Sequence, residues 1–409
     1  MERHRIEPRR DWQRTVEEQG LVYPLTRYPD DSLRPYWDES AYYRFSLAEI
    51  EALETTVDEL HALCLEAAAH IVARDRFAEL GITDPRVVAL IRESWHRRSE
   101  QPSLYGRFDL RYDGRGPAQL LEYNADTPTS LVEAASPQWF WMEERFPGAD
   151  QWNSLHERLV AAWRRQAHLL PPGPVHFAHS EVDELGEDRM TTAYLMETAR
   201  QAGLATAPVP VESIGWDAAG CRFVDLELRP IRSIFKLYPW EWLVSDEFGG
   251  HVVDSASLDG AALDGSPAAG RTDGYRRAAR TCWIEPAWKM LLSNKALLAV
   301  LWELNPGHPN LLPAHLDGPR LLKSYAAKPL LGREGAGISL VGAGVPAAPL
   351  DPDQAYCWQQ LAPLPVFDGN HVVLGAWTVD GEAAGLGIRE SAGPVTDEYA
   401  RFLPHVIID

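Results

Sequence analysis

The chain has little cysteine and no excess of basic residues. Its four cysteines, Cys64, Cys221, Cys282 and Cys357, lie far apart without a CxxC pair, which argues against a disulfide framework and a zinc knuckle. Lysine and arginine number 39 against 59 aspartates and glutamates, a formal net charge of −20. Because nucleic acids and anionic lipids are bound through clustered Lys and Arg, this balance argues against both as partners. The same charge is compatible with a cationic ligand such as an amine.

Long apolar runs and several catalytic motifs are also missing. No uncharged apolar stretch approaches the roughly 20 residues that a membrane helix needs. Residues 1–14 are charged throughout and lack the apolar core of a signal peptide, so we expect a soluble, cytoplasmic protein. The sequence contains no HExxH motif and no GxSxG elbow. These absences argue against a zinc hydrolase and an α/β-hydrolase.

The chain is long enough for a substantial core, since 45% of its 409 residues are hydrophobic, and we expect two or three packed lobes. Residues 1–45 are rich in Arg, Pro, Tyr and Trp without a sustained period, which predicts an arm laid over a larger body. Ser46 and Glu49 match a capping box, and the apolar spacing after them predicts a helix that continues to Gly81. Asp84, followed by proline, caps a second helix.

A helical pattern surrounded by short apolar strands predicts an α/β lobe between residues 171 and 285. The helix is expected over 186–203, and the strands over 176–179, 205–211 and 232–238. The stretch 249–274 is rich in Gly, Ala, Ser and Asp and is expected to be an exposed loop. From residue 286 onward, a helix, glycine-rich turns and strands alternate. The fold class indicated by these patterns is α/β (α+β).

Two β-rich segments around an Asp-Gly-Arg-Gly-Pro turn predict a hairpin with chemistry on one face. A single antiparallel register places Arg107 opposite Asn124 and Asp109 opposite Glu122. Opposed carboxylates repel unless a cation lies between them, and Asp, Glu and Asn oxygens are the ligands that Mg²⁺ prefers beside nucleotide phosphates. Thr127 offers a hydroxyl just beyond the acidic pair. A solvated hairpin face without a metal is the alternative interpretation.

A glycine-rich turn near the C-terminus is the second candidate. Lys323 and Lys328 precede Gly332, Gly335 and Gly337, whose backbone N–H groups could approach a polyphosphate closely. The turn is not a Walker A loop, because no Gly-Lys-Ser/Thr ends it, and it does not match a dinucleotide fingerprint. On these residues alone, a structural turn between two strands remains the alternative.

Seven segments, in order, carry a resemblance to a known family: YGRFDL, LLEYNADTPTSLVEA, GEDRMTTAYL, SNKALLAVLWELNPGHP, KSYAAKPLLGREGAGISLV, YCWQQLAPLP and GLGIRES. Together they resemble the synthetase part of the glutathionylspermidine synthase family, over residues 30–405. The resemblance implies a multi-lobed, ATP-grasp-like fold with a helical N-terminal region. It also implies ATP and two Mg²⁺ ions as cofactors. In such enzymes ATP phosphorylates a carboxylate, and an amine attacks the acyl phosphate.

The resemblance assigns roles to residues at matching positions. The implied magnesium ligands are Asp109, Glu122 and Asn124, and the implied arginines at the transferring phosphoryl group are Arg107 and Arg389. The implied ATP-binding residues are Lys295, Lys328, Glu334 and Gly335 at the phosphates and Gln359, Gln360, Leu361 and Ala362 at the adenine. The implied substrate residues are Thr127 and Lys236 for a thiol peptide, and Glu187 with Asp188 for a polyamine.

The resemblance also divides the chain into domains. An arm (1–45) precedes a synthetase (46–409), which consists of helices with the metal hairpin (46–170), an α/β substrate lobe (171–285) and an ATP-binding lobe (286–409). We expect no N-terminal cysteine amidase domain. Thr127 stands where the family shows Ser, and Asp188 where it shows Glu. Both changes leave ligase chemistry intact and bear on the identity of the substrate pair.

Three functional hypotheses follow. The first is an ATP- and Mg²⁺-dependent carboxylate–amine ligase, whose partners are a small-molecule or peptide carboxylate and an amine. The second is a non-catalytic ATP-binding protein that acts as an interaction partner. The third is a phosphotransferase that releases a stable phosphorylated small molecule without any amine. The sequence indicates neither the substrate pair nor an oligomeric state.

Overall fold

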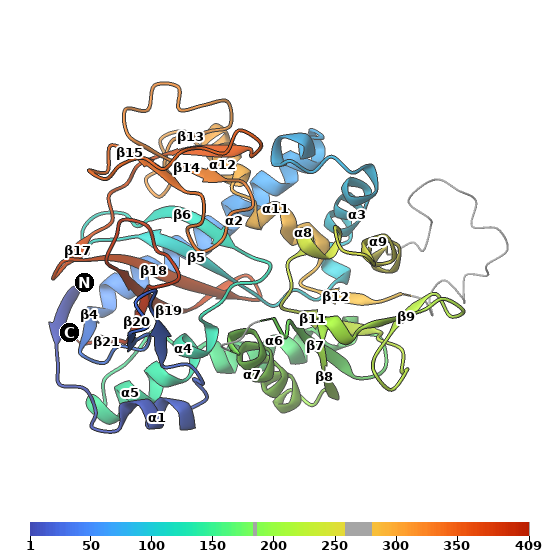
Figure 1. Ribbon diagram of the computed structural model, residues 1–409, viewed down its shortest axis with the longest axis horizontal. Coiled ribbons are helices and arrows are strands. Elements are labelled where there is room, and N and C mark those ends of the chain that lie inside the picture. The colour runs from blue at the N-terminus through green and yellow to red at the C-terminus, as the bar shows by residue number, and fades with distance from the viewer. Residues whose placement is uncertain (183–185, 258–279, 409) are drawn as a thin grey trace.

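The computed structural model describes residues 1–182, 186–257 and 280–408, in which helices pack around several sheets (Figure 1). The helices are α1 (Trp12–Glu18), α2 (Leu47–Ala73), α3 (Pro85–His96), α4 (Leu131–Ala135), α5 (Pro137–Arg145), α6 (Leu155–Gln166), α7 (Glu187–Gln201), α8 (Trp240–Leu243), α9 (Gly249–Ala256), α11 (Met290–Ser293) and α12 (Ala296–Leu304). The strands of the N-terminal half are β1 (Glu2–Arg5), β2 (Leu25–Arg27), β3 (Leu33–Pro35), β4 (Ala41–Phe45), β5 (Tyr105–Arg111), β6 (Gln119–Asn124), β7 (Val175–His179) and β8 (Thr206–Pro210). The later strands are β9 (Gly215–Asp217), β10 (Arg222–Val224), β11 (Ser233–Lys236), β12 (Cys282–Ile284), β13 (Ala314–His315), β14 (Tyr325–Pro329), β15 (Ser339–Val341), β16 (Tyr356–Gln360), β17 (Val366–Phe367), β18 (Asn370–Val379), β19 (Glu382–Ser391), β20 (Arg401–Leu403) and β21 (His405–Ile407).

The long helix α2 begins where the sequence predicts. The Ser46 side chain accepts a hydrogen bond from the Glu49 backbone N–H, and the Glu49 carboxylate accepts one from the Ser46 N–H, so the capping box is confirmed. The predicted continuation to Gly81 is wrong, because α2 ends earlier and a separate 3-10 turn, Phe77–Leu80, leads to that glycine. Between them, Asp75 takes a left-handed φ of 56°, which interrupts the helical hydrogen bonds.

The predicted hairpin is β5 with β6, at one edge of a six-stranded sheet of order β20-β19-β18-β5-β6, with β17 beside β18. Arg107 lies opposite Asn124, and Asp109 lies opposite Glu122, as predicted. The prediction of a single register is wrong beyond this point. A β-bulge follows Asp109, and it makes Leu121 an extra residue of β6.

The predicted α/β lobe is a four-stranded parallel sheet of order β12-β11-β7-β8, with α7 packed against β7 and β8. Gly203, where the predicted helix ends, follows α7 with a φ of 94°. The prediction of a loop over 249–274 is wrong for its first part, because residues 249–256 form α9, which buries Val252 and Val253. Residues 258–274 of that prediction lie outside the described residues.

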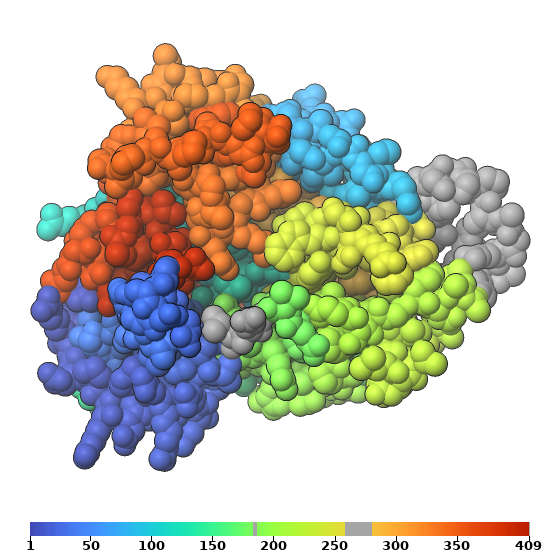
Figure 2. Space-filling model, in the orientation of Figure 1, coloured from blue at the N-terminus to red at the C-terminus, as the bar shows by residue number. Residues whose placement is uncertain are grey.

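A third sheet, of order β13-β16-β14-β15, is antiparallel and carries the glycine-rich turn between β14 and β15. In Figure 1 this sheet lies above the six-stranded sheet, and the parallel sheet lies below and to the right. The space-filling view in Figure 2 is hollowed near its centre, where the orange, red, yellow and green segments meet. The hairpin β5–β6 therefore lies between the antiparallel sheet that carries the glycine-rich turn and the parallel sheet of the α/β lobe.

Residues 1–45, predicted as an arm, pair with the C-terminal strand and bury large side chains in the body of the protein. Strand β4 is the middle of a three-stranded sheet, antiparallel to β1 and parallel to the C-terminal strand β21. The side chains of Trp37, Tyr43 and Phe45 are fully buried. The two chain ends consequently lie close together, as Figure 1 shows.

The main core forms where α2 and α12 pack together and α2 also covers β19. Leu60 and Cys64 of α2, Val300 of α12 and Leu374 of β18 are among its fully buried side chains. In the described parts of the chain, no helix is both long and apolar enough to cross a membrane.

Candidate active site

A cavity of about 400 Å³ opens between the hairpin, the glycine-rich turn and the α/β lobe. Fourteen of the site residues that the family resemblance implies line it: Arg107, Asp109, Glu122, Asn124, Thr127, Lys295, Lys328, Glu334, Gly335, Gln359, Gln360, Leu361, Ala362 and Arg389. They come from segments almost 300 positions apart in the chain. The fold therefore gathers in one place the hairpin and the turn that the sequence marked separately.

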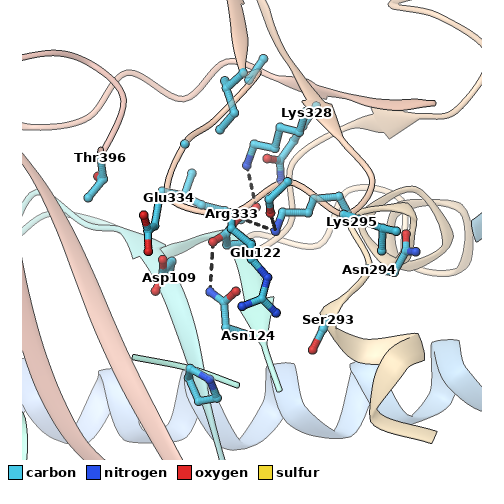
Figure 3. A pocket seen from close by; sticks show the side chains of 18 of the residues that line it. Asp109, Glu122, Asn124, Ser293, Asn294, Lys295, Lys328, Arg333, Glu334 and Thr396 are labelled. Carbon is cyan, nitrogen blue, oxygen red and sulfur yellow. Dashed lines mark hydrogen bonds and ion pairs between the residues drawn. The ribbon is translucent and has the colours of Figure 1, made fainter. Parts of the chain in front are cut away.

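The predicted metal ligands share one wall of this cavity, as Figure 3 shows. Their common face follows from the hairpin register, since alternate residues of a strand point the same way. The Asn124 side-chain amide donates to Glu122 Oε1 at 3.0 Å, so the amide oxygen of Asn124 is left available as a ligand. Asp109 is almost fully buried.

Two lysines from the C-terminal lobe, residues 286–409, face Glu122 (Figure 3). Lys295 Nζ lies 3.3 Å from Glu122 Oε2 and also donates to the carbonyl of Gly332 at 2.8 Å. Burial by itself would raise the pKa of Glu122, but the charges of Lys295 and Lys328 hold that pKa well below its usual range. Burial lowers the pKa of Lys328, and the charge of Glu122 opposes this shift.

Lys328 is bonded to the β-bulge of the hairpin. Its ammonium donates to the carbonyl of Leu121, the extra residue of β6, at 2.8 Å. Gln359 donates to the neighbouring carbonyl, that of Leu120, at 2.9 Å. The bulged part of the hairpin is thus bonded to two strands of the C-terminal lobe, β14 and β16. Bulges are common beside active sites.

Two arginines bind Asp109 from different strands. Arg107 Nε donates to Asp109 Oδ1 at 2.7 Å, and Arg389 of β19 donates to Oδ2 at 2.6 Å. Burial would lower the pKa of Arg107, but the adjacent Asp109 carboxylate raises it, so the guanidinium stays charged. Two positive groups are therefore bonded to Asp109, in addition to the two lysines near Glu122.

The glycine-rich turn lines the cavity, and its residue Arg333 contacts residues of two other segments. Arg333 donates to the hydroxyl of Thr127 at 2.9 Å and lies 3.5 Å from the Glu241 carboxylate. Gly335, with a φ of 72°, approaches Thr396 so closely that a Cβ there would lie 2.8 Å from the Thr396 carbonyl oxygen. Only glycine fits this backbone position without a shift of the neighbouring segment.

The predicted adenine segment ends β16. Backbone N–H groups of Gln360 and Leu361 donate to the carbonyls of Pro313 and Ser324, at 2.7 and 3.1 Å. These bonds hold the segment as a wall of the cavity, with Leu361 and Ala362 as part of its lining. An apolar wall beside backbone polar groups is the usual environment of a purine ring.

Three predicted substrate residues do not line the cavity. Lys236 is buried and lies 2.6 Å from Asp126, so its ammonium is ion-paired within the protein. Glu187 and Asp188 form the first turn of α7 in the α/β lobe, and each of them interacts with another part of the protein. The substrate contacts implied for these three residues remain predictions.

Several other cavity residues were not anticipated from the sequence, among them Arg333, Glu241, Ser293, Asn294 and Thr396. Arg333 lies inside the glycine-rich turn, and Ser293 and Asn294 immediately precede Lys295, so their positions beside marked residues were the available signal. Glu241 and Thr396 belong to segments without any such signal.

The donor set is consistent with Mg²⁺ that also binds phosphate. No cluster of three or more His, Cys, Asp or Glu able to hold a metal exists among the residues that the structure describes. Asp109, Glu122 and Asn124 supply two carboxylates and one amide oxygen, which are too few for a closed protein cage. Mg²⁺ commonly takes one or two carboxylates and completes its octahedron with water and nucleotide phosphates, so these residues fit such an ion.

Comparison with known proteins gives the family. A family model described as "Glutathionylspermidine synthase preATP-grasp" matches residues 3–264 and 268–408. A protein of Haemophilus influenzae with the provisional name acid–amine ligase is 39% identical over 388 residues, 91% of each chain. The trypanothione synthetase of Crithidia fasciculata and the bifunctional glutathionylspermidine synthetase/amidase of Escherichia coli are each 28% identical and cover 93% and 91% of this chain. The chain spans only 58% and 60% of the length of these two relatives.

The solved structures support the fold. A glutathione-synthetase-like effector from Globodera pallida, in its apo form, matches with a TM-score of 0.57 and 11% identity, over 97% of this chain and 96% of that one. The predicted α/β, ATP-grasp-like, multi-lobed fold is therefore confirmed. The family consists of ATP-dependent amide ligases, with ATP and Mg²⁺ as cofactors. With a family model that covers nearly the whole chain, this protein belongs to the glutathionylspermidine synthase family.

Proposed function

We propose that this protein is an ATP- and Mg²⁺-dependent ligase that joins a carboxylate to an amine through an acyl phosphate. One observation supports this above others. In a single cavity, Asp109 and Glu122 lie opposite each other on neighbouring strands, with two arginines bonded to Asp109 and two lysines close to Glu122. Opposed charges of this kind suit a polyphosphate with its metal ions, which needs anionic ligands for the metal and cationic ligands for the phosphates.

Each group has a proposed role. Asp109, Glu122 and Asn124 would hold Mg²⁺, which neutralises charge on the β- and γ-phosphates when bound. Lys295 and Lys328 would bind phosphate oxygens in place of their present partners. The cavity segment that contains Gln359–Ala362 would pack against the adenine.

The arginines would act during the transfer itself. A carboxylate oxygen of the substrate attacks the γ-phosphorus, the bond to the β-bridging oxygen breaks, and ADP leaves. Arg107 and Arg389 lie beside Asp109 and would donate to the phosphoryl oxygens as negative charge develops there. The amine nitrogen then attacks the acyl carbon, phosphate leaves, and the protons lost by the amine pass to solvent. No covalent bond to the protein is required.

The substrate pair belongs to this proposal. Relatives with names that include glutathionylspermidine and trypanothione point to a glutathione-like peptide as the carboxylate and a polyamine as the amine. Thr127 lies on the cavity wall where it could contact the peptide. The acidic first turn of α7, Glu187 and Asp188, would attract the polyamine. The proposal concerns synthesis, in the cytoplasm. The chain spans 58% and 60% of the length of those two relatives.

Release of ADP tests the ligase directly. Purified protein with ATP and Mg²⁺ should release ADP and phosphate rapidly only when glutathione and spermidine are both present, or another acid and amine from a panel. With ¹⁸O in the substrate carboxylate, one labelled oxygen should appear in the released phosphate, because the acyl phosphate transfers it.

Other outcomes decide against the proposal. A stable phosphorylated acid formed without an amine would identify a phosphotransferase. Tight ATP binding without turnover under any acid and amine would identify a non-catalytic nucleotide-binding protein. Failure to bind ATP in calorimetry, with or without Mg²⁺, would reject the whole assignment of the cavity.

A further inference from the structure

Lys236 ends strand β11 and is buried inside the protein. Only 1% of its surface is exposed, and its ammonium lies 2.6 Å from Asp126 Oδ1 and 5.0 Å from the ring centroid of Trp240. The aspartate is equally buried, at 2%. The ammonium of Lys236 is therefore paired with a carboxylate and lies near an aromatic ring inside the protein.

Asp126 is the centre of a small network next to the cavity. Its second carboxylate oxygen accepts the backbone N–H of Trp240 at 2.9 Å. Its own backbone N–H, together with that of Ala125, donates to the Ser293 hydroxyl at 2.9 and 3.0 Å. The side chain of Asp126 is therefore bonded to the α/β lobe, and the backbone at residues 125 and 126 is bonded to Ser293 at the end of α11.

This network lies between residues that line the cavity. Asn124 and Thr127 flank Asp126 in the chain, and both line the cavity wall. Glu241, next to Trp240 in α8, lines the cavity from the other lobe. A shift of Asp126 would move the metal ligand at 124, the hydroxyl at 127 and the lobe that carries Glu241 relative to one another.

We propose that Lys236 is a positioning residue for the reaction, which acts through Asp126 to fix segment 124–127 against the α/β lobe, and that it does not bind the substrate. This inference rests on the proposed function, because it concerns where that reaction takes place. To bind a substrate carboxylate, Lys236 would have to leave Asp126 behind as a buried charge without a cation. Such a loss is far more costly than the removal of both members of the pair together.

Removal of one charge and of both charges separates the two roles. Lys236→Met leaves the Asp126 charge buried and should lower kcat at least about tenfold, with the KM for glutathione changed less than about threefold. The double variant Lys236→Met with Asp126→Asn carries neither charge and keeps an acceptor for the Trp240 N–H, and its kcat should return to within about threefold of the wild type. A lysine that binds the substrate cannot be rescued by a change of Asp126, so a folded double variant with no recovery overturns the proposal.

Hydrogen exchange of the free protein gives a second readout that needs no substrate. Peptides covering 124–130 should exchange at least about fivefold faster in Lys236→Met and recover in the double variant. Unchanged exchange of this segment in Lys236→Met overturns the proposal. A double variant that cannot fold also overturns it, since the pair would then be required for folding as a whole.

A matched control lies far from the cavity. Arg9 and Glu39 form another buried ion pair, at 2.6 Å, in the N-terminal segment. Arg9→Met should lower thermal stability with kcat and the exchange of 124–130 kept within about twofold of the wild type. If wild-type protein shows no ligase activity, the proposed function fails while the exchange experiment still reports whether Lys236 holds the segment. The two failures are therefore distinguishable.

Discussion

Arg389 and Asp109 lie 280 positions apart in the chain and form a 2.6 Å ion pair across the six-stranded sheet. They belong to β19 and β5, which are separated by β18. The intervening strand has Gly375 opposite Asp109, and a Cβ on this glycine would lie 3.0 Å from the Arg107 side chain. The absence of a side chain at 375 lets both arginines reach the same carboxylate.

Replacement of Arg389 by methionine should lower ATP turnover about 10²- to 10³-fold, the usual effect when a group that stabilises transition-state charge is lost. The thermal midpoint should change little, because Arg107 still neutralises Asp109. Steady-state ADP release and calorimetric unfolding measure the two effects. The control is Arg401→Met on the adjacent strand β20. Arg401 is bonded to Asp38 and Glu390 and does not line the cavity, so its loss should lower stability and leave turnover intact.

Glu122→Gln removes one of the two carboxylates proposed to hold Mg²⁺. The variant should bind Mg²⁺-ATP at least about tenfold more weakly and turn it over about 10²-fold more slowly, since an amide is a poor ligand for a hard cation. Binding of Mn²⁺ in the presence of ATP, followed by electron paramagnetic resonance, checks the metal site without reference to catalysis. The control Glu303→Gln alters a glutamate bonded to Arg76 outside the cavity. Equal Mn²⁺ affinity in the two variants would contradict the metal role of Glu122.

The sequence predicted the hairpin contacts because a two-residue period is a local property. Alternation together with one antiparallel register places Asp109 opposite Glu122, and the structure agrees. The bulge at Leu121 could not be predicted in this way. It accompanies bonds from Lys328 and Gln359, which are more than 200 positions away and belong to another sheet.

Composition gave the wrong prediction for helix α9. Gly, Ala and Ser in the stretch 249–274 indicated a loop, yet residues 249–256 are helical. Tertiary packing outweighs weak helix propensity here, because α9 buries Val252 and Val253 where it meets α3 and β12.

Arg333 illustrates another limit of prediction from the sequence. The glycines marked the turn, but its contact with Thr127 depends on how two lobes meet.

Gly335→Ala should impair the approach of the glycine-rich turn to the segment around Thr396. An added Cβ would lie 2.5 Å from the Val395 side chain and 2.8 Å from the Thr396 carbonyl oxygen, and the residue has a φ of 72°. We expect the KM for ATP to rise at least about tenfold, with a stability loss of about 1 kcal/mol from the backbone conformation. Gly344→Ala is the matched control, because its φ of 77° is similar and nothing lies within 4 Å of the added Cβ. Similar KM values for the two variants would show that backbone strain alone is responsible.

The buried His405 should make the protein less stable in mild acid. Burial lowers the pKa of His405 to about 3, whereas a histidine in the unfolded chain titrates near about 6.5. Between these two values the unfolded chain binds more protons, so the contribution to stability is complete above pH of about 6.5 and is lost as the pH falls toward 3. The slope approaches about 1.4 kcal/mol per pH unit. Urea unfolding at pH 7, 6 and 5 measures it.

His405→Asn should flatten this pH dependence, because the asparagine amide can keep the bond that His405 Nδ1 makes with Gln138 Oε1 at 3.1 Å and has no proton to gain. A second buried histidine, His61, has its pKa lowered by burial to about 4, so part of the slope should persist in the variant. His168→Asn, at an exposed position, is the control and should leave the slope unchanged. An equal slope in wild type and His405→Asn would contradict this prediction, because it would mean that folding does not change the pKa of His405.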